Sequence, residues 1–95
     1  MASKIKVTRG SGNVFYDIGF SKTEAENLML RAQLMTAITQ RARKLTQTRS
    51  AKLFGVTQPR MNDLLRGKIG KFSLDALVKM LANAGMRVEM RVRAA

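Results

Sequence analysis

The spacing of apolar residues predicts a long helix in the first half of the chain. Ser21 and Glu24 have the spacing of a capping box, in which a hydroxyl and a carboxylate each satisfy a backbone N–H at a helix start. From there to about Arg43, apolar residues recur every three or four positions, as in an amphipathic helix. The predicted stripe consists of Leu28, Ala32, Met35, Ile38 and Ala42, widened by Leu30, Leu34 and Ala37.

Three shorter helices are predicted after position 45, each between a hydroxyl-bearing cap and a glycine. Pro59 falls in the first turn of the second of them, where backbone N–H groups have no intrahelical partner and proline is tolerated. The cap and the terminating glycine are Thr46 and Gly55 for helix 47–54, Thr57 and Gly67 for helix 58–66, and Ser73 and Gly85 for helix 74–83. The last helix is expected to bury one face, made of Leu74, Leu77, Val78 and Leu81.

The two ends of the chain have strand-like or irregular patterns. Residues 1–20 are interrupted by Gly and Ser and predict an arm with at most one weak strand, around Lys4–Val7. Residues 86–93 alternate apolar and polar without a break, which predicts a strand. A single strand leaves backbone groups unpaired on both edges, so it needs a partner, either segment 4–7 or the same strand of a second copy. We prefer the second copy, with a dimer interface of Met86, Val88, Met90 and Val92.

Two of the predicted helices have the layout of a helix-turn-helix. They are helices 47–54 and 58–66, and a tight turn at Gly55 and Val56 joins them. In that motif the second helix enters the major groove of DNA. Met61, Leu64 and Leu65 supply its inward face, so the outward face presents amide, guanidinium and carboxylate groups. Such groups can bind base edges: Gln or Asn binds adenine, Arg binds guanine and Asp binds cytosine.

This arrangement predicts two groups of DNA-contacting residues. Asp63 has two interpretations, because phosphates repel a carboxylate: it contacts a cytosine, or it pairs with Arg60 or Arg66. Pro59 has no N–H and is expected to make van der Waals contact. The expected phosphate contacts are Gln47, Arg49, Arg66, Lys68 and Lys71, and the expected base contacts are Gln58, Pro59, Arg60, Asn62 and Asp63.

The distribution of charge favours a polyanionic partner. The 95 residues include 18 Lys and Arg against 6 Asp and Glu, a net charge of +12. Residues 41–71 hold nine of the basic residues and a single acidic one, Asp63, which is a net +8 in one third of the chain. Clustering of this kind is typical of nucleic-acid binding. Excess charge for solubility is the simpler alternative.

The residue types that are missing exclude several kinds of site. The chain has no His and no Cys, which excludes disulfides, imidazole or thiolate zinc sites and His-activated nucleophiles. The six acidic residues are scattered and no phosphate-binding loop is present, so we expect neither an enzyme, a cofactor nor a metal. No apolar run exceeds three residues, so we expect no membrane span and a cytoplasmic, nucleoid-associated protein.

Part of the sequence resembles the XRE, or lambda-repressor-like, helix-turn-helix family. The resemblance is carried by the runs LTQ at 45–47, LFGVTQPRM at 53–61 and LLRGK at 64–68. The flanking sequence is similar to the HigA-like antitoxin branch of that family, in the runs SGNVFYDIGF at 11–20, FSLDAL at 72–77 and GMRVE at 85–89. The resemblance covers about residues 11–93. It implies a dimeric DNA-binding antitoxin that represses its own operon, with a small mRNA-cleaving toxin as its partner.

The resemblance also implies roles for individual residues. Gln47 and Gln58 stand where the family has DNA-contacting glutamines, Pro59 and Arg60 where base-contacting residues follow, and Arg66 where a backbone contact is common. The chain differs at Lys44, where the family usually has Gly. A left-handed backbone at a residue other than Gly costs roughly 1 kcal/mol, so strain is expected there.

Together these observations predict a mainly α fold: a four- to five-helix lambda-repressor-like helix-turn-helix domain with a C-terminal dimerising β-strand. We expect an N-terminal arm at 1–20, the DNA-binding domain at 21–85, and the strand and tail at 86–95. In the arm, Val14, Phe15, Tyr16 and Phe20 either contact a toxin or fold back on the first and last helices.

The preferred function is that of an antitoxin and transcriptional autorepressor of a type II toxin–antitoxin operon. It would bind a pseudo-palindromic operator in double-stranded DNA as a homodimer. Two alternatives stay open: a phage or cellular XRE-type regulator without a toxin, and a non-specific nucleoid or RNA-binding protein. The neighbouring reading frame would distinguish the first alternative. Scrambling the operator at fixed salt would distinguish the second, because specific binding is typically tighter by about 10³ or more.

Overall fold

Four helices and two short strands make up the part of the chain that the structure describes. The structure is a computed structural model, and it describes residues 4–8, 15 and 18–94. The predicted fold class, mainly helical with a C-terminal strand, is confirmed. The elements are β1 (Lys4–Thr8), α2 (Lys22–Ala42), α3 (Gln47–Phe54), α4 (Gln58–Leu65), the 3₁₀ turn η1 (Ile69–Lys71), α5 (Leu74–Asn83) and β2 (Arg87–Arg91).

Each helix begins at the hydroxyl-bearing residue that the sequence indicates. The side chains of Thr46, Thr57 and Ser73 each accept a hydrogen bond from the backbone N–H three residues later, at 3.1–3.3 Å. A cap of this kind contributes about 1 kcal/mol to helix stability. Ser21 accepts in the same way from the Glu24 N–H, but its hydroxyl also donates to the Glu24 carboxylate at 3.1 Å. In a capping box the glutamate carboxylate accepts from the backbone N–H of the cap residue. Here the Glu24 carboxylate accepts from the Ser21 hydroxyl.

The end of α2 differs from the expectation at Lys44. No residue other than Gly has a positive φ in the described part of the chain, so Lys44 is not left-handed and the predicted strain is absent. Instead the chain leaves the helix through tight turns, in which the N–H of Lys44 donates to Arg41 and that of Leu45 donates to Ala42. A right-handed backbone at Arg43, with φ −59°, makes this exit possible without glycine.

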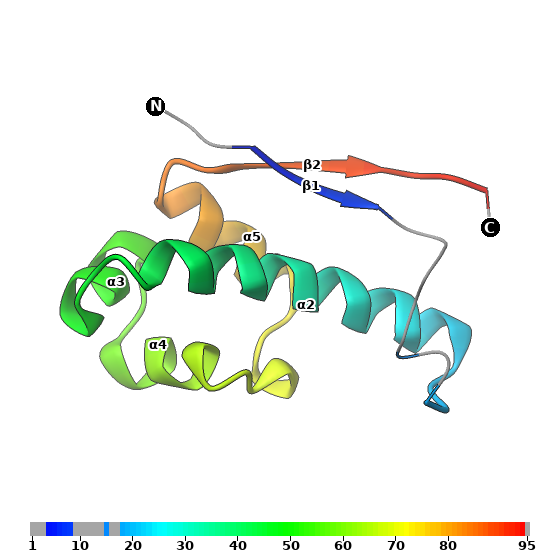
Figure 1. Cartoon of the computed structure of the whole chain (residues 1–95), viewed down its shortest axis with the longest axis horizontal. Helices are drawn as coiled ribbons and strands as arrows, with labels where there is room; N and C mark the ends of the chain where they lie inside the picture. The colour runs from blue at the N-terminus through cyan, green and yellow to red at the C-terminus, as the bar shows by residue number, and fades with distance from the viewer. Residues whose placement is uncertain (1–3, 9–14, 16–17, 95) are drawn as a thin grey trace.

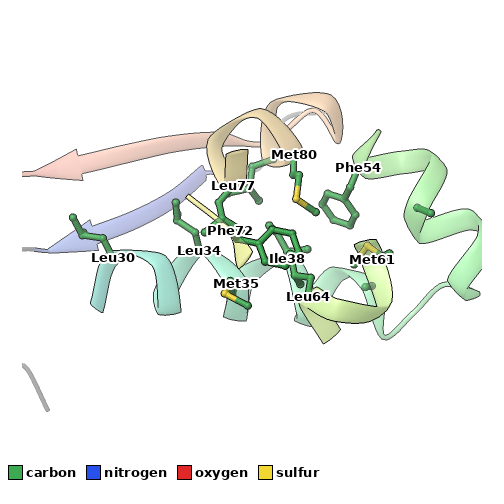
Figure 2. Close-up of a cluster of buried hydrophobic side chains, with 13 residues drawn as sticks. Leu30, Leu34, Met35, Ile38, Phe54, Met61, Leu64, Phe72, Leu77 and Met80 are labelled. Carbon is green, nitrogen blue, oxygen red and sulfur yellow. The ribbon is translucent and has the colours of Figure 1, made fainter. Parts of the chain in front are cut away.

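A single apolar core joins the four helices, as Figure 2 shows. The face that α2 buries follows Leu30, Leu34 and Ile38, whereas the predicted Leu28 and Ala32 are only half-buried. On α5, Val78 was predicted to be buried and is 40% exposed, because Met80 turns inward instead. The residues that meet around α2 are Met35, Phe54, Met61, Leu64, Phe72, Leu77, Met80 and Leu81.

β1 and β2 form a two-stranded parallel sheet whose register runs from Lys4 opposite Arg87 to Thr8 opposite Arg91. β1 contacts α2 and β2 contacts α5, and the sheet and α4 lie on opposite sides of α2 (Figure 1). Of the two partners considered for the C-terminal strand, the structure shows the one that we did not prefer, since segment 4–8 of the same chain pairs with it. Two strands at opposite ends of the chain can pair in parallel because the whole helical domain forms the crossover between them.

The apolar residues predicted to contact a toxin or to fold back on the helices are only partly described by the structure. The ring of Phe15 meets that of Phe20 edge to face, with centroids 6.1 Å apart. Val14 and Tyr16 lie outside the described residues. None of the described helices is both long enough and apolar enough to span a membrane.

Candidate nucleic-acid interface

The α3–α4 pair is held firmly by its turn and by the core. Gly55 ends α3 with a φ of +71°, and the side-chain amide of Asn83 on α5 donates to the Phe54 carbonyl at 3.2 Å. Phe54 and Met61 are fully buried, so the apolar sides of both helices are fixed against α2 and α5. The first turn of α4 then faces solvent, and Gln58 is exposed.

Two side-chain hydrogen bonds join the exposed sides of α3 and α4. The amide of Gln47 donates to the Asn62 side-chain oxygen at 3.2 Å, and the amide of Gln58 donates to the Thr48 hydroxyl at 3.1 Å. Both are exposed, and they link the first turn of α3 to the start and the middle of α4. The structure thus brings together three predicted residues, Gln47, Gln58 and Asn62. Thr48 joins them but was not predicted, because nothing in the sequence distinguishes it from other polar residues inside a helix.

Arg60 lies against the loop that follows α4. Its guanidinium stands 4.3 Å from the centre of the Phe72 ring and donates to the Lys71 carbonyl at 3.1 Å. Phe72 is 1% exposed, so the arginine covers a core aromatic ring while remaining half-buried itself. A cation–π contact of this kind contributes roughly 0.5–1 kcal/mol at exposed sites. In the unbound protein the guanidinium is thus engaged with the chain itself.

Asp63 pairs with two lysines of the same loop. Its carboxylate lies 3.2 Å from the Lys68 ammonium and 3.3 Å from that of Lys71. The prediction that Asp63 pairs with Arg60 or Arg66 was wrong, because the left-handed turn at Gly67 places the ammonium groups of the two lysines beside the carboxylate instead. The hydrogen bond from Lys68 most strongly lowers the pKa of Asp63 below 3.8, and that from Lys71 acts in the same direction, while desolvation opposes them.

Arg31 on α2, which the sequence analysis did not single out, stabilises this loop from the other side. Its guanidinium donates to the Ile69 carbonyl at 3.1 Å and to the Phe72 carbonyl at 3.3 Å. The only signal in the sequence is a basic residue within the mostly apolar run at 28–38. The loop that bears Lys68 and Lys71 therefore has a defined position relative to α4.

The other predicted DNA-contacting residues are distributed around the same surface. Pro59 is exposed in the first turn of α4, Arg66 caps its C-terminal end, and Arg49 is exposed on the first turn of α3. Among the described residues, no three acidic side chains come together as a metal ion would require. The predicted residues present amide and guanidinium or ammonium groups, which can bind bases and phosphates.

The predicted dimer residues are spread over different environments. Met86 and Val88 are half-buried against the core, whereas Met90 is 48% and Val92 is 73% exposed. Met86 and Val92 lie just outside β2, which is shorter than the predicted strand. Val78 and Ala82 on α5 line a groove together with Met86 and Val88.

A comparison with protein families gives one match over most of the chain. The model of a family described as a helix-turn-helix domain matches residues 14–93, a range that includes every predicted DNA-contacting residue. None of the curated proteins compared with the chain matches it.

Proposed function

The chain belongs to the helix-turn-helix domain family over residues 14–93, and on this basis we propose that it is a sequence-specific, DNA-binding transcription regulator. The main support is the geometry of α4. Its apolar side is fixed in the core through Met61 and Leu64, while Gln58 and Pro59 project from its first turn. A short helix held in this way can insert its N-terminal end into the major groove.

The proposed division of contacts follows from what each side chain touches. Gln58 and Asn62 stand on the outward side of α4 and are our candidates for base contacts, with Pro59 beside them for a thymine methyl. Arg60 can reach a guanine only by leaving Phe72, and Asp63 a cytosine only by leaving its lysines. Phosphate contacts are assigned to Gln47, Arg49, Arg66, Lys68 and Lys71.

We further propose that the protein is a homodimer assembled along the free edge of β2. β2 pairs with β1 on one edge and with no other described strand. Antiparallel pairing with a second β2 would extend the sheet to four strands and cover the groove beside Val78 and Ala82. Because α4 lies on the side of α2 away from the sheet (Figure 1), both α4 helices would then face the same side. Such a dimer suits half-sites about 34–36 Å apart.

The specific role that we propose is that of an antitoxin repressing its own operon from the nucleoid, without enzymatic activity. The support is the resemblance of residues 11–20, 72–77 and 85–89 to the HigA-like branch. Ile18 and Phe20 are 67% and 40% exposed, and they precede α2 at its end away from α3 (Figure 1). A small mRNA-cleaving toxin could contact them while leaving α4 free.

Footprinting on the DNA upstream of the protein's own gene tests whether the protein binds DNA there and whether that binding is sequence-specific. We expect protection of two half-sites, and loss of protection when the half-sites are scrambled at constant salt. A protected region that is insensitive to scrambling would favour a non-specific DNA-binding protein.

Repeating the footprint with the product of the adjacent gene tests the antitoxin role. We expect that product to bind the protein and to change the protected region or the affinity. A regulator without a toxin would give the same footprint with and without it.

A further inference from the structure

Asp63 occupies an unusual position in the charge distribution of the molecule. It is the single acidic residue in the segment 41–71, which contains nine basic residues. It lies on α4 itself, two turns or less from the residues proposed to contact bases. A carboxylate at this place weakens the attraction of the surface for DNA unless it has a specific role.

The contacts of Asp63 are imposed by the backbone and by the length of the lysine side chains. The N–H of Lys68 donates to the Asp63 carbonyl at 3.1 Å, and Gly67 turns with a φ of +75°. This turn brings both ammonium groups within 3.3 Å of the carboxylate. The lysine side chains are 43% and 57% exposed and the aspartate is 24% exposed, so solvent and ligands reach the lysines more readily.

A carboxylate and a DNA phosphate bind an ammonium group in the same way. Both are anionic oxygen acceptors, so Asp63 competes with phosphates for Lys68 and Lys71. Exposed ion pairs are worth only about 0–1 kcal/mol, so a phosphate can displace the carboxylate. The competition is independent of base sequence, because phosphates are the same in every duplex.

We propose that Asp63 is an internal competitor of DNA phosphates, which acts through Lys68 and Lys71 and limits the affinity of the protein for every duplex. The inference rests on the proposed DNA-binding function. It predicts that Asp63 neither contacts a base nor supports the lysines in their DNA contacts. Its carboxylate reduces the number of counterions released on binding by about one.

The test compares Asp63→Asn with the wild-type protein on operator DNA and on a random duplex of equal length. We expect both affinities to rise about fivefold at about 0.1 M salt, with a salt slope steeper by about one. Asp75→Asn is the matched control, because it removes one exposed acidic charge on α5, outside the 41–71 segment. It should change both affinities less than twofold.

A second set of variants tests whether the effect passes through the two lysines. In a Lys68→Gln, Lys71→Gln background, Asp63→Asn should change affinity less than twofold, and circular dichroism shows whether each variant is folded. A loss of operator binding alone would make Asp63 a base contact, and a loss on both duplexes would make it a support for the lysines; either result overturns the inference. If the wild-type protein binds no duplex, the proposed function itself fails.

Discussion

At the scale of single residues, the hydrogen bonds between α3 and α4 determine which groups are available to DNA. Gln58 uses one N–H on Thr48, which leaves its other N–H and its oxygen for a base. Gln47 donates to the Asn62 oxygen, so the Asn62 amide group stays available to an acceptor. Both amides are therefore oriented before DNA binds, which lowers the entropy lost on binding.

Replacing Gln58 tests the proposed base contact. Gln58→Ala should weaken binding to the operator by roughly 1–3 kcal/mol and relax the preference at one base pair, because a bidentate contact is lost. Titrations on operators substituted one base pair at a time measure this. Thr48→Ala is the control, since it removes only the partner of Gln58 and should change the operator affinity less. An equal loss on random DNA would contradict a base-contacting role.

Replacing Lys68 tests the proposed phosphate contacts. Lys68→Ala should weaken binding to operator and random DNA alike and flatten the salt slope by about one, because one fewer phosphate is neutralised. Binding isotherms at several salt concentrations measure the slope. Lys79→Ala removes an exposed charge from α5 and should leave the slope nearly unchanged. A selective effect on the operator would place Lys68 among the base-contacting residues instead.

The titration of Asp63 follows from the same ion pairs. Because Lys68 and Lys71 lower the pKa of Asp63 below 3.8 in the folded protein, its contribution to stability is present above pH 3.8 and disappears as the pH falls through the folded pKa. NMR titration of the Asp63 carboxyl carbon should give a midpoint below 3.8. Lys68→Ala should raise that midpoint towards the ordinary value, and an unchanged midpoint would contradict the assigned cause.

At the scale of elements, the turn between α3 and α4 is constrained both by its own backbone and by contact with α5. A Cβ added to Gly55 would lie 2.5 Å from the side-chain nitrogen of Asn83, which donates to the Phe54 carbonyl. Gly67 has a similar φ of +75°, but a Cβ there would have no atom within 4 Å. Replacing Gly67 would therefore introduce backbone strain alone, whereas replacing Gly55 would introduce backbone strain and a steric clash.

Comparing the two glycines tests how the pair of helices is held. Gly67→Ala should lower the free energy of unfolding by about 1 kcal/mol through left-handed strain alone. Gly55→Ala should lower it by about 2–3 kcal/mol, because the hydrogen bond from Asn83 is also displaced. Urea denaturation measures both. Equal losses would mean that the Asn83 contact contributes nothing to the turn.

At the scale of the whole molecule, the parallel sheet joins the two ends of the chain on the side away from α4. This leaves one edge of β2 and the exposed Val78 in positions where a second copy can contact them. The dimer interface that we propose therefore differs from the one predicted by sequence alternation. It uses α5 and the free edge of β2, because Val88 on the inner face of the strand packs against the core.

A charge placed on this surface tests the proposed dimer. Val78→Glu should give a monomer at concentrations at which the wild-type protein elutes as a dimer, and should weaken operator binding at least tenfold. Ile18→Glu is the control, since Ile18 is also exposed but belongs to the segment before α2 and to neither α5 nor β2. Gel filtration at two concentrations measures both. A wild-type protein that is monomeric throughout would contradict the dimer.

Local signals in the sequence determined where each of the four helices begins and where α3 and α5 end. Thr46, Thr57 and Ser73 cap helices through hydrogen bonds to residues three positions away, and Gly55 and Gly67 end them through their own backbone freedom. Such interactions involve near neighbours only, so the bounds of α3 and α5 could be predicted to the residue. The net charge of segment 41–71 is likewise a property of composition.

Only the tertiary structure decided which groups from distant segments meet. Arg31 reaches the carbonyls of Ile69 and Phe72, and β2 pairs with β1 across the whole domain. The partners of Asp63 depend on where the turn after α4 places two flexible lysines. Periodicity shows that a helix has an apolar side, but the elements packed around it select the residues that are buried, which is why Leu30 and Met80 lie inside while Leu28 and Val78 do not.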